Sequence, residues 1–199
     1  MSLFWHQTGT YLSKSYICGH CGNSLASNVG YYKTSSPDGS GSAREYIYIC
    51  HHCYAPTYFT GAGQQTPGPR PGEDVEGIGD AGVKSLYKEA RDAYSKSAFT
   101  ASILCCRKLL MHVAVSKGAP SGGTFISYVE YLSSNNYVPP GAKEWVDHIR
   151  EKGNEANHEI KIMTKEEADD LLSFSSMLLK LVYEFPSKMQ GKTTPTKKV

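Results

Sequence analysis

The sequence predicts two domains of different fold class, a small β-rich zinc ribbon followed by an all-α helical bundle. Three observations predict this division. Two CxxC pairs lie in an N-terminal part rich in Tyr, Ile, Val and Thr; a segment rich in Gly and Pro follows; an apolar period typical of helices then begins. We therefore expect a ribbon over 1–60, a flexible linker over 61–80, a helical bundle over 81–186 and a disordered basic tail over 187–199.

The composition is that of a folded, soluble protein. Of 199 residues, 40% are hydrophobic and 20% are charged, which is close to globular averages. The net charge of +2 neither demands nor excludes a nucleic-acid partner. Residues 1–6 lack the basic-then-apolar order of a signal peptide, and no apolar run reaches the roughly 20 residues of a membrane helix. We therefore expect a cytoplasmic location.

The N-terminal part is expected to form short strands and turns. The run 15–17 precedes the first cysteine pair, and the run 44–49 precedes the second. Between them, residues 35–42 are Ser, Pro, Asp and Gly, which predicts a loop.

Four cysteines have the spacing of a metal site, namely Cys18, Cys21, Cys50 and Cys53. A two-residue gap lets both thiolates of a pair reach one tetrahedral ion from a tight turn. The sequence therefore predicts a structural zinc ion. Because four thiolates complete its coordination, no position stays open for water and no catalytic metal is expected.

Two alternatives to zinc fit this chain less well. Disulfides are rare in the cytoplasm, and a thioredoxin-like redox pair would need a surrounding βαβ pattern that the sequence lacks. His20, His51 and His52 lie in or beside the CxxC pairs and could replace a cysteine, but four thiolates already suffice.

The ribbon also mixes aromatic and cationic residues, which would suit stacking on single-stranded nucleic acid. The set comprises Tyr31, Tyr32, Lys33, Arg44, Tyr46, Tyr48, Tyr54 and Tyr58. The alternative is that half of them form the ribbon's own hydrophobic face. Protein contact or oligomerisation through the ribbon stays open beside nucleic-acid binding.

Beyond the linker, the apolar period predicts five helices, at about 81–97, 98–117, 123–135, 140–158 and 164–185. The last has the clearest start, since Thr164 followed by Glu167 fits a capping box. Pro186 is expected to end it. Cys105 and Cys106 lie in an apolar helix and are expected in the core.

Three polar residues of the fourth helix have the spacing of a phosphodiester site. Arg150, Asn154 and His158 follow one another at intervals of four, so a continuous helix would place them on one face. His158 could exchange a proton with a ribose 2′-hydroxyl, and Arg150 could neutralise charge on the phosphate. The alternative is an ordinary solvated helix face.

The run 145–160, with the helix around 105–110 and the capped helix after it, resembles a bacterial domain family of unknown function. That family is often attached to restriction and phage-defence proteins and is similar to the HEPN superfamily of helical bundles. The likeness covers about residues 80–186. It implies a HEPN-like bundle that acts as a metal-independent ribonuclease, with an Arg-Asn-x-x-x-His motif paired in dimers.

Asn154 and His158 match that motif, but Gly153 stands where the motif has its arginine. Arg150, or Arg107 on a neighbouring helix, could supply the missing cation. A zinc finger joined to such a bundle is also similar to the zinc-finger ribonucleases of bacterial anti-phage defence.

Together these features predict a metal-independent endoribonuclease that acts on RNA in defence or toxicity. A homodimer or a larger homo-oligomeric ring is expected, with a phage protein as a possible trigger. The alternative is a non-catalytic adaptor that binds nucleic acid or protein and oligomerises through the bundle.

Overall fold

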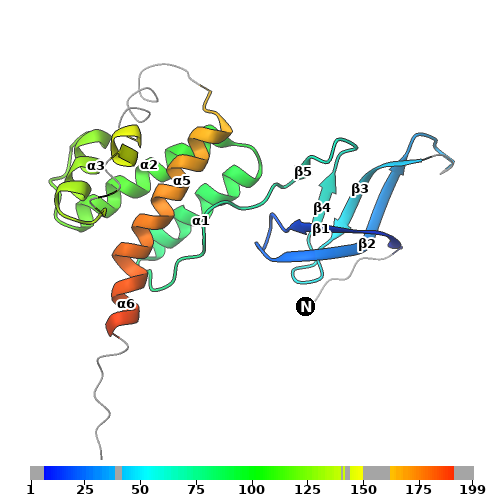
Figure 1. The fold of residues 1–199 in the computed structure, drawn as a ribbon, viewed down its shortest axis with the longest axis horizontal. Coiled ribbons are helices and arrows are strands. Elements are labelled where there is room, and N and C mark those ends of the chain that lie inside the picture. Colours follow the sequence, from blue (N-terminus) through cyan, green and yellow to red (C-terminus); the bar gives the residue numbers. More distant parts are fainter. Residues whose placement is uncertain (1–6, 39–41, 140, 142–143, 150–161, 191–199) are drawn as a thin grey trace, which may run out of the picture. The chain divides into compact units, whose positions relative to one another are not determined.

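The computed structural model describes residues 7–38, 42–139, 141, 144–149 and 162–190. The chain divides into two compact units. The first comprises Met1–Arg70 with Tyr94–Ser97, and the second comprises Pro71–Ala93 with Ala98–Val199. An antiparallel sheet carrying four cysteines forms the first unit and helices form the second, which confirms the predicted fold class (Figure 1).

The first unit is a five-stranded antiparallel sheet in which the strands follow one another in chain order. Its strands are β1 (Gly9–Ile17), β2 (Ser24–Thr34), β3 (Ala43–Ile49), β4 (Pro56–Phe59) and β5 (Gln65–Thr66). The first CxxC pair occupies the turn between β1 and β2, and the second occupies the turn between β3 and β4. Both pairs therefore lie at the same end of the sheet, because antiparallel neighbours joined in sequence return to alternate ends.

The middle of β2 interrupts the alternation of buried and exposed residues. Leu25 and Ser27 are buried, and Gly30 is the next buried residue, so the alternation shifts by one residue between them. Ser27 Oγ donates a 2.8 Å hydrogen bond to Ile49 O. Gly30 cannot be replaced by a residue with a side chain unless the backbone moves, because a Cβ there would lie 1.8 Å from Ile47 O. Gly30 is thus buried because the β3 backbone approaches it closely.

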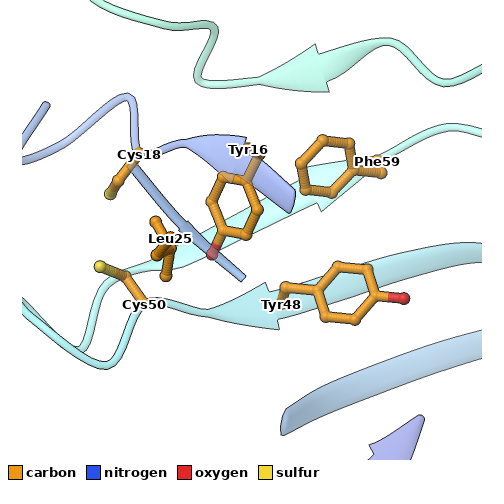
Figure 2. Close-up of a cluster of buried hydrophobic side chains, with 6 residues drawn as sticks. All are labelled: Tyr16, Cys18, Leu25, Tyr48, Cys50 and Phe59. Atoms are coloured by element: carbon orange, nitrogen blue, oxygen red, sulfur yellow. The ribbon is translucent and has the colours of Figure 1, made fainter. Parts of the chain in front are cut away.

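That face carries the small core of the ribbon unit. The cluster comprises Tyr16, Cys18, Leu25, Tyr48, Cys50 and Phe59 (Figure 2). The rings of Tyr16 and Phe59 meet edge to face with centroids 5.2 Å apart, and the rings of Tyr48 and Phe59 do so at 5.9 Å. Two of the six members are cysteines, so the core and the cysteine cluster are continuous.

The second unit contains the predicted helices. They are α1 (Ala81–Ser95), α2 (Phe99–Ser116), α3 (Phe125–Ser134), a helical segment at 144–149, and α5 (Lys165–Leu179). The capping box of α5 forms as predicted, since Glu167 N donates to Thr164 Oγ1 at 3.2 Å and Thr164 N donates to Glu167 Oε2 at 2.8 Å. Helix α2 is central, because it packs on both α3 and α5.

The prediction that Pro186 ends the last helix is wrong. The chain continues as the π-helix η2 (Lys180–Glu184) and then as α6 (Phe185–Gln190). Pro186 directly follows this π-helical turn, whose wider hydrogen-bond pattern interrupts the regular α-helical ladder beside the missing N–H. Residues 187–190, predicted as the start of a disordered tail, are therefore helical, and 191–199 lie outside the described residues.

The range 61–80 has more structure than its Gly and Pro content predicts. Residues 65–66 form β5, and residues 71–77 form an extended strap in the helical unit. Arg91 Nε donates to Pro71 O at 2.9 Å, and the Tyr87 hydroxyl donates to Glu73 O at 2.9 Å. Glu76 N donates to a carboxylate oxygen of the buried Glu184 at 3.2 Å. Side chains thus satisfy the backbone groups that Pro and Gly leave outside regular structure.

Helix α2 is long and apolar enough to resemble a membrane span by length and composition. Its 18 residues have a mean hydropathy of 1.3, and 44% of them are buried in the protein. The core helix of a soluble protein has the same properties, and α2 packs on α3 and α5. Among the described residues, α2 is the one helix of this kind.

Candidate metal centre

Two turns of equal backbone geometry present the four cysteines. In the first turn, Cys18 N donates to Asn23 O at 2.9 Å and Gly22 N donates to Cys18 O at 2.8 Å. In the second turn, Cys50 N donates to Ala55 O at 3.0 Å and Tyr54 N donates to Cys50 O at 2.8 Å. The same two hydrogen bonds therefore close each turn, and we call these turns the knuckles.

The residue that follows the second cysteine of each knuckle has a left-handed backbone. This residue is Gly22 in the first knuckle, with φ of 77°, and Tyr54 in the second, with φ of 58°. Glycine adopts this conformation freely, whereas a residue with a Cβ is strained there by about 1–2 kcal/mol. The second knuckle thus adopts the same left-handed backbone even though Tyr54 carries a Cβ.

The four sulfurs form one compact group. Cys18 Sγ lies 3.7 Å from Cys53 Sγ, and Cys21 Sγ lies 3.8 Å from Cys50 Sγ. All four ligand atoms lie within 4.8 Å of one another. A tetrahedral ion with Zn–S bonds of about 2.3 Å would hold its sulfurs roughly 3.8 Å apart. The four cysteines can therefore hold one metal ion.

The four cysteines differ in how strongly their surroundings favour the ionised thiolate. Cys18 and Cys50 are fully buried, whereas Cys53 is exposed. Burial raises the pKa of Cys18. Burial also opposes ionisation of Cys21, but hydrogen bonds from the backbone and side chain of Asn23 outweigh it and lower the pKa of Cys21 to about 7. Asn23 Nδ2 lies 3.4 Å from Cys21 Sγ, so an amide donor outside the ligand set already supports that sulfur.

The knuckle histidines lie outside this group of four ligand atoms. His20 Nε2 lies 3.0 Å from Pro56 O, and the rings of His51 and His52 contact each other with centroids 4.4 Å apart. Among the described residues, the cysteine quartet is the one group of three or more Cys, His, Asp or Glu with metal-binding geometry. The structure thus brings together the four residues that the spacing selected.

The aromatic and cationic residues of the ribbon divide between its core and its surface. Tyr48 is buried, and Tyr46 stacks on it with centroids 5.6 Å apart. Tyr32 and Tyr54 are 45% and 50% exposed. Lys33 pairs with Glu45 at 2.8 Å. Tyr31 and Tyr58 are half-buried, and the side chain of Arg44 lies outside the described part of the structure.

Of the predicted catalytic residues, Arg150, Asn154 and His158 lie outside the described residues. Arg107 is described, and it is only 5% exposed. Its guanidinium carbon lies 4.4 Å from the centre of the Phe125 ring, and burial lowers the pKa of the side chain. A guanidinium remains charged in this setting, because its ordinary pKa is above 12.

Arg107 lines a cavity of about 20 Å³ between α2, the helical segment 144–149 and α5. The other lining residues are Ile103, His148, Ile149, Met163, Glu167, Asp170 and Leu171. His148 Nε2 lies 3.2 Å from Asp170 Oδ2, so the pair borders this cavity. The segment that leads into Arg150 therefore packs beside Arg107.

The structure adds one polar contact that the sequence did not predict. Asp80 Oδ1 accepts hydrogen bonds from Gly82 N and Val83 N, and its Oδ2 lies 3.1 Å from His112 Nε2. These residues border a hollow of about 350 Å³ between α1 and α2, whose lining includes Glu89 and Lys108. An N-cap signal at Asp80 was readable in the sequence, but its pairing with a residue 32 positions away was not.

The cysteines of α2 are packing residues, in line with their apolar sequence context. Cys106 is fully buried, and burial raises the pKa of its thiol to about 12. Burial also raises the pKa of the half-buried Cys105. Such thiols stay protonated near neutral pH and are poor nucleophiles.

Comparison with known proteins gave one match. Residues 88–197 match DUF4145, a domain of unknown function. No curated protein and no solved structure matches the chain. The matched range covers more than half of the 199 residues and spans the helical unit from within α1 onward. The chain therefore belongs to the DUF4145 family.

Proposed function

We propose that the chain is a metal-independent endoribonuclease, in which a HEPN-like helical unit cleaves RNA and a zinc ribbon serves as sensor or substrate-binding module. The proposal extends the family membership with the sequence resemblance around residues 145–160. Its cellular role in this proposal is anti-phage defence or toxicity.

Zinc is the ion that we assign to the four cysteines. A set of four thiolates, with sulfur separations near those of a tetrahedral Zn–S centre, suits this borderline-soft ion. When bound, the ion stabilises the ribbon by cross-linking the two knuckles. With four protein ligands it takes no part in the cleavage.

The observation that best supports the nuclease is the packing around Arg107. Ile149 is 3% exposed and borders the same cavity as Arg107, so the helical segment 144–149 is anchored on α2 immediately before the candidate residues. A rigid support of this kind is what a catalytic helix needs.

In the proposed reaction, His158 takes the proton of a ribose 2′-hydroxyl, whose oxygen attacks the adjacent phosphorus. Arg150 neutralises the charge that develops on the phosphate, and Asn154 orients the reacting groups. The 5′-oxygen leaves and takes a proton from the protonated His158 of the second motif in the expected dimer, and the other product ends in a 2′,3′-cyclic phosphate. Arg107 is 5% exposed and stacked on Phe125, so we assign it to the support of this helix and assign the phosphate contact to Arg150.

The decisive experiment combines purified full-length protein with a defined RNA in the presence of enough EDTA to remove free divalent ions. Cleavage that leaves cyclic phosphate ends is expected for the wild type. His158→Ala should abolish it, and an RNA with 2′-deoxy at the cut site should resist it. A requirement for added magnesium, or full activity of His158→Ala, would refute the mechanism.

The second candidate function is a non-catalytic adaptor for nucleic acid or protein. Gly153 at the position of the motif arginine favours it, and so does an apolar stripe on α2. Leu104 and Val115 on that helix are 51% and 40% exposed, and Met111 between them is half-buried. Such a stripe suits homo-oligomerisation. Cellular toxicity that survives His158→Ala would favour the adaptor.

A further inference from the structure

Two hydroxyl groups are buried in the ribbon unit with no hydrogen-bond partner beyond each other. Tyr16 is 8% exposed and Thr57 is 0% exposed. Within the described part of the chain, the Tyr16 hydroxyl and Thr57 Oγ1 lie within reach of each other, and neither has a further hydrogen-bond partner. A pair of hydroxyls uses only one of its two O–H donors internally, and folded proteins rarely leave a buried donor unpaired. These two groups therefore call for a physical explanation.

Both residues are placed by the strands that carry the cysteines. Tyr16 is two positions before Cys18 at the end of β1, and it belongs to the same buried cluster as Cys18 and Cys50 (Figure 2). Thr57 lies on β4 in register with Tyr48, which is two positions before Cys50 on β3. The two hydroxyls are thus held on strands adjoining the two knuckles.

The Tyr16 ring cannot turn its hydroxyl toward water. It packs edge to face on Phe59 at 5.2 Å and lies 6.5 Å from Tyr48, measured between ring centroids. In Figure 2 the ring lies between the two cysteines and Phe59. Tyr48, in contrast, has a backbone partner, because its hydroxyl donates to Leu12 O at 3.0 Å.

A metal ion held by four thiolates would give these hydroxyls a role as hydrogen-bond donors. Four thiolates and one divalent ion carry a net charge of about −2, which requires hydrogen-bond donors around the sulfurs. The one side-chain donor already described, Asn23, belongs to the first knuckle and lies at the surface. On the buried side of the site, where Cys18 and Cys50 are 0% exposed, bulk solvent does not reach the sulfurs.

We propose that Tyr16 and Thr57 are positioning residues of the metal centre, whose hydroxyls stabilise the charge of the metal–thiolate group from its buried side. The inference rests on metal binding by the four cysteines, but it depends neither on the ribonuclease activity nor on the helical unit. It goes beyond the cysteine pattern, because no spacing rule selects a Tyr or a Thr at these positions.

The alternative is that both hydroxyls are packing defects, and it predicts a change of opposite sign. Replacing both hydroxyls of such a pair by apolar groups of the same shape is neutral or stabilising. Loss of a group that supports metal ligands instead weakens metal binding, typically by about 10-fold to 100-fold. Metal affinity therefore separates the two explanations by direction as well as size.

The test uses full-length protein and the variants Tyr16→Phe, Thr57→Val and the double variant, all of which keep side-chain volume. Zinc affinity is measured at neutral pH by competition with a chelator of known affinity. The absorption of the Co²⁺-loaded proteins, with its thiolate-to-metal charge-transfer band, gives a second readout. Far-UV circular dichroism verifies that the helical unit is unchanged in each variant.

Each single variant is expected to bind zinc at least about 10-fold more weakly than the wild type and to shift the charge-transfer band. If the hydroxyls act as a linked pair, the double variant loses less than the product of the two single losses. Affinity equal to or tighter than wild type in the double variant would overturn the inference. A wild type that binds neither Zn²⁺ nor Co²⁺ would instead refute the metal centre itself. If one single variant fails to fold, the double variant and the other single variant still supply the comparison.

Discussion

Gly22 and Tyr54 occupy equivalent positions in the two knuckles, and both have a left-handed backbone, with φ of 77° and 58°. Each donates its backbone N–H to the carbonyl of the first cysteine of its pair. The knuckle therefore requires a left-handed backbone at this position. Glycine adopts this backbone without strain in the first knuckle, whereas tyrosine is strained in the second.

Tyr54→Gly is expected to stabilise the ribbon by about 0.5–1 kcal/mol, since relief of the left-handed strain exceeds the entropy cost of glycine. The lost contacts are few, because Tyr54 is 50% exposed. Gly22→Ala, the matched variant, should destabilise by about 1 kcal/mol. Unfolding of the metal-loaded protein in denaturant measures both. A Tyr54→Gly variant less stable than wild type would mean that the ring packs on something essential.

Metal binding should weaken as the pH falls. A thiol must lose its proton to bind, and the pKa of Cys21 is lowered to about 7, so its protonation competes with the metal once the pH drops through about 7. The pKa of Cys18 is raised by burial, so affinity should continue to increase at alkaline pH. Zinc competition between pH 5.5 and 9 tests this dependence. A pH-independent affinity would contradict thiolate ligation.

Removal of the metal should unfold the ribbon and leave the helices intact, because cysteines form part of the small ribbon core. Cys50→Ser should have the same effect as prolonged chelation. A partial loss of the near-UV tyrosine signal reports on the ribbon, which holds eight of the 14 tyrosines within residues 11–58, and unchanged far-UV ellipticity at 222 nm reports on the helices. Cys105→Ser, outside the quartet, is the control and should retain the metal.

Thr164→Ala should destabilise the helical unit by about 1 kcal/mol, because it removes one half of the capping box of α5. Thr164→Ser keeps the accepting oxygen and should remain within a few tenths of a kcal/mol of the wild type. Thermal unfolding followed at 222 nm provides the comparison. Equal losses in both variants would show that the threonine methyl, rather than the cap, is what matters.

Asp80→Ala should lower the melting temperature, since it removes the cap of α1 together with the contact to His112. Hydrogen bonds from Val83, His112 and Gly82 lower the pKa of Asp80, so the contribution is complete above the ordinary pKa of about 3.9 and disappears as the pH falls through the lowered value. Asp80→Asn keeps a capping oxygen and should lose less. If Asp80→Asn lowered the melting temperature as much as Asp80→Ala, the charge of Asp80 rather than its capping oxygen would be the stabilising feature.

Leu104→Glu should reduce self-association, because Leu104 is 51% exposed on the apolar stripe of α2. Leu12→Glu is the matched control, since Leu12 is 85% exposed in the ribbon unit and lies outside this stripe. Light scattering coupled to size-exclusion chromatography measures the mass. An unchanged mass in the Leu104 variant would remove α2 from the interface.

The sequence predicted the features that depend on residues close together in the chain. Two CxxC pairs identified the ligand group, and the apolar period located the first three helices and the start of the last one to within a few residues. It did not predict the shift of alternation in β2, the continuation through Pro186, the strap at 71–77 or the contact between Asp80 and His112. Each of these depends on a partner distant in the chain, such as Ile49 for Ser27 or Glu184 for Glu76, and spacing rules contain no information about such partners.

The strap has a practical consequence for producing the helical unit alone. Fragments beginning at residue 88, where the family match starts, would cut α1 in half and discard Pro71 and Glu73, which accept hydrogen bonds from Arg91 and Tyr87. Truncation at 81 would keep α1 and still discard both acceptors. A soluble, cooperatively melting fragment should therefore begin at residue 71.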